Sequence, residues 1–273
     1  MNKNLLIKLD NIFKSFVVGS QEIEIIKDIS FTVSEGEFLV IFGPSGCGKS
    51  TLLHIMLGLE RPTKGLVEFL GKDLYQYRED QRSRIRKRGI GMIYQQANWI
   101  KALNVLENVS FPLTLMGVLL AEREKRAWEA LELVGMKQGA HQVPTELSSG
   151  QQQRIALARA LISNPALIIA DEPTGNLDSK AGEEMMRLFK KLNEKQKTII
   201  MVTHDLEYIT YASRAVNIVD GKLVGDYSAK DRALKKFIVS KKGNNHNLHG
   251  DQQLANGGGS SFNDNSSDLK NEN

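Results

Sequence analysis

The nine residues from Gly43 to Thr51, GPSGCGKST, restrict the fold of this chain more than any other part of its sequence. They fit the pattern G-x-x-x-x-G-K-[ST] and stand between EFLVIFG, typical of a strand, and STLLHIMLGLE, typical of a helix that ends before Pro62. In this setting glycines let successive backbone N–H groups surround phosphate oxygens. Lys49 can approach the β- and γ-phosphates, and the Ser50 hydroxyl can bind Mg²⁺. The segment predicts a nucleoside triphosphatase of unspecified kind. Its predicted phosphate-binding residues are Gly43, Pro44, Ser45, Gly46, Cys47, Gly48, Lys49, Ser50 and Thr51.

Two acidic residues follow a second apolar segment, ALIIAD, at the end of a predicted strand. Ligands of open α/β sheets bind at the carboxyl ends of strands, where Asp171 can hold Mg²⁺ directly or through water. Glu172 is next in the chain, so its side chain should point away from that of Asp171. It is placed to polarise an attacking water. The alternative is a solvated acidic turn, which is disfavoured because the same chain contains the phosphate loop.

Composition limits the class of protein further. The chain has 273 residues, of which 41% are hydrophobic and 25% charged, as in an ordinary soluble globular protein. Its net charge of +4 is scattered and weaker than expected for a nucleic-acid-binding protein, so we predict no nucleic-acid partner. The single cysteine, Cys47, excludes an intrachain disulfide and a cysteine-based zinc finger. The sequence contains no apolar run of about 18 residues and no signal-peptide pattern, which predicts a cytoplasmic location.

Strand-like and helix-like segments alternate along much of the chain. Residues 4–43 predict short strands joined by turns, and residues 104–143 predict helices, with a capping box at Asn104 and Glu107 and a stop at Gly135. From residue 145 a helix, the strand ALIIAD, a helix at 179–194, the strand KTIIMVT and a helix near 205–212 follow one another. This alternation predicts a parallel sheet covered by helices. The segment NIVDGKLVG predicts a hairpin that turns at Asp220-Gly221.

The last part of the chain has a different character. The segment AKDRALKKFIVSKKG predicts one basic amphipathic helix, and the Gly-, Asn- and Ser-rich remainder predicts a disordered tail. The basic helix could lie on anionic lipid, but its apolar face is only Leu234, Phe237 and Ile238, so a solvated terminal helix is favoured.

The segment TELSSGQQQRIALARAL, at 145–161, predicts a helix with an anion-binding N-terminus. Ser148 or Ser149 can cap it, and apolar residues recur at helical spacing. Yet the segment has no lysine for a phosphate and no carboxylate for chemistry. It therefore supplies half of a phosphate site, about a hundred residues after the phosphate loop.

LSSGQ, the acidic pair, TGNLDS and MVTHD together resemble the ATP-binding subunits of ABC transporters, over about residues 4–227. The combination is most similar to the lipoprotein-releasing, macrolide- and peptide-exporting and cell-division branch. The resemblance implies an α/β fold of the P-loop NTPase class, ABC type. Such a fold has a mostly parallel sheet core, an N-terminal antiparallel β subdomain and a helical signature subdomain at about 96–163. The predicted domains are 1–227 for ATP binding and 228–273 for a C-terminal extension.

The resemblance also implies roles for individual residues. Phe16 matches the aromatic residue that stacks on adenine, where tyrosine is commoner, although a core aromatic remains an alternative. Gln95 matches the glutamine that touches Mg²⁺ and the attacking water and moves with the membrane partner. Asp178 matches the acidic residue of the loop at the dimer interface, and His204 the histidine that contacts the γ-phosphate. The catalytic residues so implied are Lys49, Gln95, Glu172 and His204, the metal ligands Ser50, Gln95 and Asp171, and the signature residues Ser148, Ser149, Gly150 and Gln151.

In that family two copies pack head to tail, and each ATP is held between the phosphate loop of one copy and the signature helix of the other. The half site at 145–161 would then be completed by a second chain. The implied function is an ATPase that uses Mg²⁺ and drives a separate membrane permease from the inner face of the membrane, exporting or extracting a lipoprotein, peptide or drug. A mechanotransducing ATPase of the same fold is an alternative. A DNA-repair ATPase ranks low, because about 50 residues separate Gln95 from the signature, without the sustained heptads of a long coiled coil. A ribosome-acting ATPase ranks low as well, because such members carry two of these domains and one is seen in this sequence.

Two positions raise separate questions. Where the family usually has L-S-G-G-Q, Ser149 replaces the first glycine. A serine with positive φ would cost about 1 kcal/mol, whereas a serine at the helix N-cap is favourable, and we prefer the N-cap position.

Cys47 lies at the head of a helix, where a thiol is often reactive, so the sequence predicts that labelling it blocks hydrolysis.

Overall fold

The computed structural model describes residues 4–232 and 234, and the chain divides into two units, Met1–Lys230 and Asp231–Asn273. All helices and strands below belong to the first unit, while most of the predicted basic helix and the predicted disordered tail lie outside the described residues. The strands are β1 (Leu5–Val18), β2 (Gln21–Ser34), β3 (Phe38–Phe42), β4 (Lys64–Phe69), β5 (Lys72–Asp73), β6 (Ile90–Ile93), β7 (Leu167–Asp171), β8 (Thr198–Thr203), β9 (Arg214–Val219) and β10 (Lys222–Ser228). The α-helices are α1 (Lys49–Met56), α2 (Glu79–Gly89), α3 (Val105–Leu115), α4 (Leu120–Leu133), α5 (Ser149–Leu161) and α6 (Ser179–Glu194), and the 3₁₀ helices are η1 (Leu74–Gln76), η2 (Lys137–Gly139), η3 (Pro144–Glu146) and η4 (Leu206–Tyr211).

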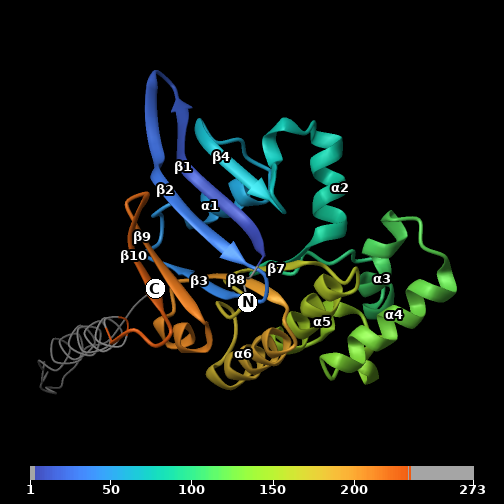
Figure 1. The fold of residues 1–273 in the computed structure, drawn as a ribbon. Coiled ribbons are helices and arrows are strands. Elements are labelled where there is room, and N and C mark those ends of the chain that lie inside the picture. The colour runs from blue at the N-terminus through green and yellow to red at the C-terminus, as the bar shows by residue number, and fades with distance from the viewer. Residues whose placement is uncertain (1–3, 233, 235–273) are drawn as a thin grey trace, which may run out of the picture. The chain divides into compact units, whose positions relative to one another are not determined.

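A six-stranded sheet with the order β10-β9-β3-β8-β7-β6 confirms the predicted parallel sheet. Its strands pair in parallel except for β10, which forms the antiparallel hairpin with β9. All five residues of β3 and all six of β8 are buried, as expected for strands covered on both faces. Figure 1 shows α5 and α6 on one side of this sheet and the four-stranded sheet on the other. Helix α1 lies between the two sheets and shares their hydrophobic core.

The predicted short strands in the N-terminal region are wrong in length. Strands β1 and β2 have 14 residues each and form a long antiparallel hairpin in a sheet of order β2-β1-β4-β5. Bulges interrupt their register, and Asn11 and Asp28 have φ angles of 49° and 55°. Each bulge shifts the alternation of apolar and polar side chains, so one continuous strand looks like several short ones in the sequence.

Local signals at the ends of elements are mostly confirmed. Asn104 accepts a hydrogen bond from the Glu107 N–H at 2.9 Å, and the Glu107 carboxylate accepts one from the Asn104 N–H at 2.8 Å. Gly135, with φ 71°, follows the end of α4 as predicted. The turn residues Asp220 and Gly221 have φ angles of 48° and 78°, which fits a two-residue hairpin turn.

Three helices differ from expectation. Helix α1 ends at Met56, earlier than predicted, and the left-handed Gly58 (φ 68°) follows it. The segment predicted as a helix near 205–212 is the 3₁₀ helix η4. Helix α2 is not predicted by the sequence, because it has no buried residue and therefore no apolar stripe.

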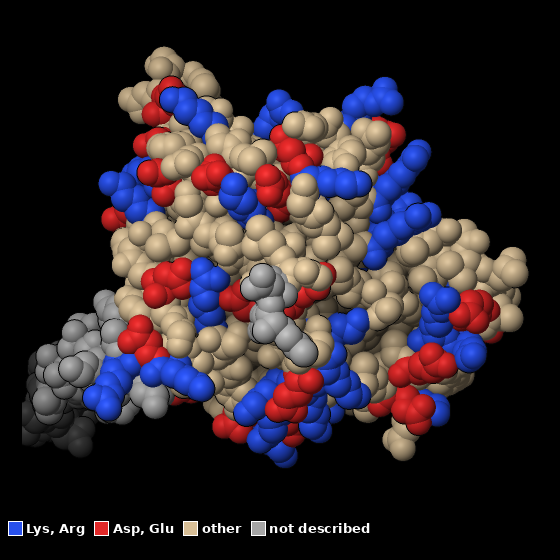
Figure 2. All heavy atoms as spheres, in the orientation of Figure 1, with Lys and Arg blue, Asp and Glu red and all other residues tan. Residues whose placement is uncertain are grey.

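Charged side chains are interspersed over most of the face in Figure 2. This distribution fits the scattered charge of the sequence. No helix among residues 4–232 and 234 is both long and apolar enough to cross a membrane.

The segment between β6 and α3 is fixed by one buried amide. Asn108 is fully buried, and its Nδ2 donates to the carbonyls of Ile100 (3.1 Å), Leu103 (2.8 Å) and Asn104 (3.0 Å). Its Oδ1 accepts a hydrogen bond from the Ile100 N–H at 3.0 Å. This side chain therefore replaces backbone partners that an irregular segment lacks.

We expect Asn108→Leu to lower the free energy of unfolding by about 2–4 kcal/mol, because the substitution leaves several buried backbone groups unpaired. Urea unfolding followed by circular dichroism measures this loss. Glu124→Ala, an exposed change on α4, is the control and should stay within about 0.5 kcal/mol of the unsubstituted protein. Equal stability of the two variants would contradict the role given to Asn108.

Candidate nucleotide-binding site

The phosphate loop runs from the end of β3 to the start of α1, where Gly48 (φ 101°) is the N-cap. A Cβ atom at Gly43 would lie 2.0 Å from the Ile218 carbonyl oxygen, so only glycine fits at the start of the loop. The left-handed conformation of Gly48 likewise favours glycine. The loop thus brings backbone N–H groups and the N-terminus of α1 together, which suits an anion.

Lys49 lies under this loop with only 6% of its surface exposed. Its ammonium donates to the carbonyls of Gly43 at 2.9 Å and Pro44 at 2.8 Å. These bonds keep the charge at the centre of the loop. A triphosphate bound there would face a positioned cation.

A pocket of about 380 Å³ lies beside the loop. Phe16 and Ile25 from the long hairpin, Glu172 from the end of β7, and the loop itself line it. Phe16 is 36% exposed, which excludes the alternative that its ring is a core aromatic. The Lys14 ammonium lies 4.6 Å from the centre of that ring. The structure therefore places the predicted adenine-stacking ring, the phosphate loop and the predicted water-polarising acid around one cavity.

Asp171 and Glu172 lie where the buried strand β7 ends. Burial raises the pKa of the Asp171 carboxyl above its usual value, and the adjacent Glu172 charge adds to the shift. At Glu172 the backbone turns into the left-handed region, with φ 46°, and its N–H donates to the Val202 carbonyl at 2.9 Å. A non-glycine residue held in this conformation is often found at functional sites.

Glu172 also meets His204, which follows β8. Its Oε1 lies 3.0 Å from the His204 Nδ1. Both residues line a second pocket of about 200 Å³, together with residues 174, 175, 177 and 179. Glu172 therefore borders two adjoining cavities, one at the phosphate loop and one at His204.

The side chains of the predicted metal ligands have oxygen atoms that suit Mg²⁺. Ser50 offers a hydroxyl, Asp171 a carboxylate and Gln95 an amide oxygen, and Mg²⁺ prefers oxygen ligands. The Gln95 side chain lies beside Gly175, where an added Cβ atom would be 2.8 Å from its Nε2. Residues 4–232 and 234 contain no cluster of three or more His, Cys, Asp or Glu side chains suited to a metal.

The signature segment starts α5 and is capped by Ser148. The Ser148 hydroxyl oxygen accepts a hydrogen bond from the Gln151 N–H at 3.3 Å, and the Gln151 side chain accepts one from the Ser148 N–H at 2.9 Å. The prediction that Ser149 is the N-cap is therefore wrong. Ser149 is the first helical residue and does not have positive φ, so serine is tolerated there without backbone strain.

The structure does not bring the signature to the phosphate loop of the same chain. Among the described residues that line the pocket beside the loop, none comes from Ser148–Gln151. Asp178 does not line that pocket either. Its carboxylate caps α6 by accepting a hydrogen bond from the Ala181 N–H at 2.8 Å. The phosphate loop and the signature segment thus line no common pocket among the described residues of one chain.

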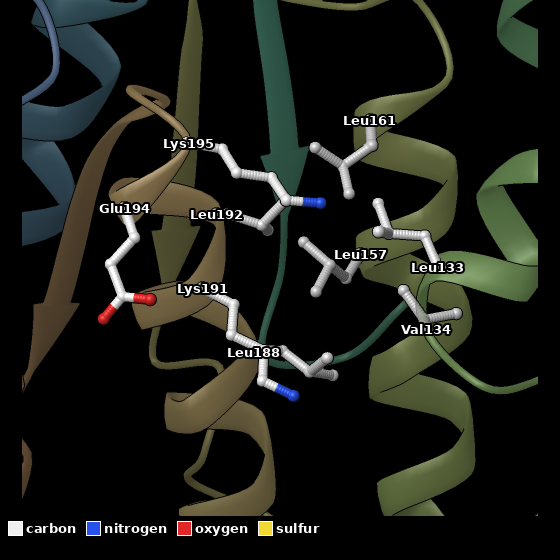
Figure 3. A pocket seen from close by; sticks show the side chains of 9 residues that line it. All are labelled: Leu133, Val134, Leu157, Leu161, Leu188, Lys191, Leu192, Glu194 and Lys195. Carbon is white, nitrogen blue, oxygen red and sulfur yellow. The ribbon is translucent and has the colours of Figure 1, made fainter.

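A third pocket, of about 210 Å³, has different chemistry (Figure 3). It lies between α5 and α6 and the end of α4, far along α5 from the signature. Leucine side chains and the stems of Lys191 and Lys195 form most of its lining, and the Glu194 carboxylate points away from it. We therefore assign no part of nucleotide binding to this pocket.

Similarity to known proteins identifies the family of this chain. The family described as ABC transporter matches residues 26–175. The chain belongs to the ABC transporter family. An uncharacterised ABC transporter ATP-binding protein of Thermotoga maritima is 46% identical over 81% of this chain and 94% of its own length. The macrolide export ATP-binding/permease protein MacB of Bartonella henselae is 39% identical over 90% of this chain, which spans 36% of that longer protein.

A solved relative supports both the fold and the activity. The ATP-binding cassette MJ0796 of Methanocaldococcus jannaschii is 44% identical over 80% of this chain and 95% of its own length. Its dimeric post-hydrolysis structure with ADP and phosphate gives a TM-score of 0.77 at 40% identity, covering 83% of this chain and all of that one. The fold is that of an ABC ATPase, as predicted, and the protein is an ATPase that binds ATP and uses Mg²⁺.

Cys47 is less accessible than its position at the head of a helix suggests, so the prediction of a reactive thiol is wrong. The side chain is buried, with 4% of its surface exposed, and its Sγ lies 3.8 Å from the Lys49 ammonium. A reagent cannot approach a thiol packed under the loop, even at a helix N-terminus.

We therefore expect a maleimide to react with Cys47 in the folded protein more slowly than in urea, by a factor on the order of ten or more. Mass spectrometry of labelled protein measures both rates. Cys47→Ser is the control for labelling elsewhere in the chain. Equal rates in the folded and unfolded protein would show that the thiol is accessible after all.

Proposed function

We propose that the protein is the ATP-hydrolysing subunit of a membrane transport system, that it works as a head-to-tail dimer, and that it powers a separate permease. The transported molecule belongs to the class of lipoproteins, peptides or drugs. The main support for the proposed dimer is that the phosphate loop and the signature cap are separate within one chain. The dimeric MJ0796 cassette supports a dimer, and MacB, which combines an ATP-binding part with a permease, supports a permease as the partner.

In this proposal the phosphate loop and the long hairpin bind ATP. The Phe16 ring stacks on adenine, which requires an aromatic face but no hydroxyl. Backbone N–H groups of residues 43–51 bind the phosphates, and Lys49 bonds to the β- and γ-phosphate oxygens. Ser50, Asp171 and Gln95 hold Mg²⁺, which offsets phosphate charge when bound.

Glu172 acts on the attacking water. Its carboxylate accepts a hydrogen bond from the water and draws a proton toward Oε2 while Oε1 faces His204. His204 keeps the carboxylate oriented, and its other ring nitrogen faces the γ-phosphate. The left-handed backbone at Glu172 directs its side chain toward the space between the two cavities.

The second chain supplies the remaining contacts. The Ser148 hydroxyl accepts from the Gln151 N–H and keeps its own hydrogen to donate to the γ-phosphate. The N-terminus of α5 adds a favourable dipole, and Gly150 allows close approach of the backbone. Asp178 lies beside the shared site and contributes to the dimer interface. ATP thus closes the dimer, and its hydrolysis reopens it.

Purification from native membranes tests the permease assignment. We expect a tagged copy of the chain, extracted in mild detergent, to bring down an integral membrane protein in stoichiometric amount, and we expect the pair to lie at the inner face of the membrane. Glu172→Gln with ATP should strengthen the recovery if closure is coupled to the partner. Recovery of ribosomes or nucleic acid, or of no membrane protein at all, would contradict the proposal.

A further inference from the structure

The segment Tyr94–Trp99, which contains Gln95 and is called the glutamine loop below, is bound along its length by α5. Gln153 on α5 donates to the carbonyls of Tyr94 (3.1 Å) and Gln95 (2.8 Å). Arg159, six residues later in the same helix, donates to the carbonyls of Ala97 and Asn98. The same helix that begins with the signature therefore holds four carbonyls of the loop that carries a proposed Mg²⁺ ligand.

Two further contacts bring the loop close to the signature cap. Trp99 donates from its ring nitrogen to the Gln152 Oε1 at 2.8 Å, and Gln152 donates to the Leu147 carbonyl at 2.9 Å. The Arg159 guanidinium lies 4.6 Å from the centre of the Trp99 ring. Because Leu147 directly precedes the Ser148 cap, the loop and the cap are joined by a short path of hydrogen bonds.

Gln153 is the buried member of this set. Only 4% of its surface is exposed, and it shares the inner face of α5 with apolar residues such as Leu157 and Ala160. Its Oε1 has no hydrogen-bond partner among the described residues, while its NH₂ group makes both bonds to the glutamine loop. Burying an amide whose oxygen has no partner costs free energy. The favourable polar contacts of this side chain are therefore its two N–H bonds to the glutamine loop.

We propose that Gln153 is a positioning residue that fastens the glutamine loop to the signature helix and so holds Gln95 where it binds Mg²⁺. This inference rests on the role of Gln95 in the proposed function. Movement of the loop would then move the signature of the same chain, because both belong to one hydrogen-bonded unit. Loss of the NH₂ group should loosen the loop and weaken metal binding without removing any metal ligand.

Gln153→Met keeps the length of the side chain and removes its donors, while Gln153→Glu keeps its size and also removes the NH₂ group. The matched control is Asn193→Leu. Asn193, like Gln153, uses its NH₂ group to bind two backbone carbonyls, those of Gly36 (2.9 Å) and Lys197 (3.0 Å), and the cavity beside the phosphate loop is lined by none of these three residues. Thermal unfolding of all variants shows whether each one is folded.

Hydrogen–deuterium exchange in the nucleotide-free protein gives the first readout. We expect Gln153→Met and Gln153→Glu to speed exchange of amides in 94–99 by about tenfold. Asn193→Leu should change exchange only near its own partners. Unchanged exchange in 94–99 for both Gln153 variants would overturn the proposal.

Mn²⁺ binding gives the second readout, measured by electron paramagnetic resonance with a non-hydrolysable ATP analogue. We expect Mn²⁺ affinity to fall by about 10- to 100-fold in Gln153→Met and in Gln95→Ala, with no further loss in the double variant. Asn193→Leu should bind Mn²⁺ normally. A fall in Gln95→Ala but not in Gln153→Met, or additive losses, would overturn the proposal for Gln153 alone. Normal binding by Gln95→Ala would overturn the Gln95 role in the proposed function and this inference with it.

Discussion

Replacing Glu172 by glutamine should lower the rate of ATP hydrolysis by about 100- to 1,000-fold and leave ATP binding nearly unchanged. Glutamine has almost the same size and can adopt the same backbone conformation, but its amide cannot accept a proton from the attacking water. Phosphate-loop contacts and the proposed Mg²⁺ ligands are unaltered by the change. Single-turnover hydrolysis and equilibrium binding of a fluorescent ATP analogue measure the two quantities separately.

Slow hydrolysis should also trap the closed state. Size-exclusion chromatography of Glu172→Gln with ATP and Mg²⁺ should show a stable dimer that disperses when ATP is removed. Asp171→Asn is the comparison, because loss of a proposed metal ligand should weaken Mg²⁺-dependent binding as well as hydrolysis. A Glu172→Gln protein with full activity would show that another group polarises the water.

Features encoded in a few neighbouring residues could be predicted from the sequence. The phosphate loop requires glycines at fixed spacing, and the acidic pair follows an unbroken apolar strand. The capping box at Asn104 and Glu107 and the turn at Asp220-Gly221 are also local. Each is encoded within nine or fewer consecutive residues, so tertiary packing has little opportunity to change it.

Other features depend on partners that the sequence does not place. Bulges hide the length of β1 and β2, and α2 is held by hydrogen bonds from Arg82 and Arg86 to the Gly58 carbonyl rather than by an apolar stripe. The contacts of Gln153 with the glutamine loop join residues 58 and 59 positions apart. A polar residue on the apolar face of α5 was the one available signal for Gln153.

Mixing two inactive variants tests most directly whether each ATP site is shared between two chains. Lys49→Ala removes the cation of the phosphate loop and should weaken ATP binding by about 10- to 150-fold, the effect of losing a charged hydrogen bond. Ser148→Arg places a bulky side chain at the proposed position of the γ-phosphate in the partner's site. Homodimers of either variant contain two damaged sites.

In a mixed dimer one site receives both lesions and the other receives neither. The intact site joins the phosphate loop of the Ser148→Arg chain to the signature of the Lys49→Ala chain. A mixture of Lys49→Ala with Ser50→Ala is the control, because both lesions lie in phosphate loops and every site keeps one of them. Thermal unfolding of Ser148→Arg shows whether loss of the N-cap has unfolded α5, since such a cap contributes about 1 kcal/mol.

The measurement is binding of a labelled, non-hydrolysable ATP analogue to heterodimers purified through two different tags. Binding avoids the requirement that both sites turn over together. If each site is shared, the Lys49→Ala and Ser148→Arg heterodimer binds one analogue per dimer with the affinity of the unsubstituted protein, and the control heterodimer binds none at that concentration. Binding by the first heterodimer no better than by either homodimer would contradict a site shared between two chains.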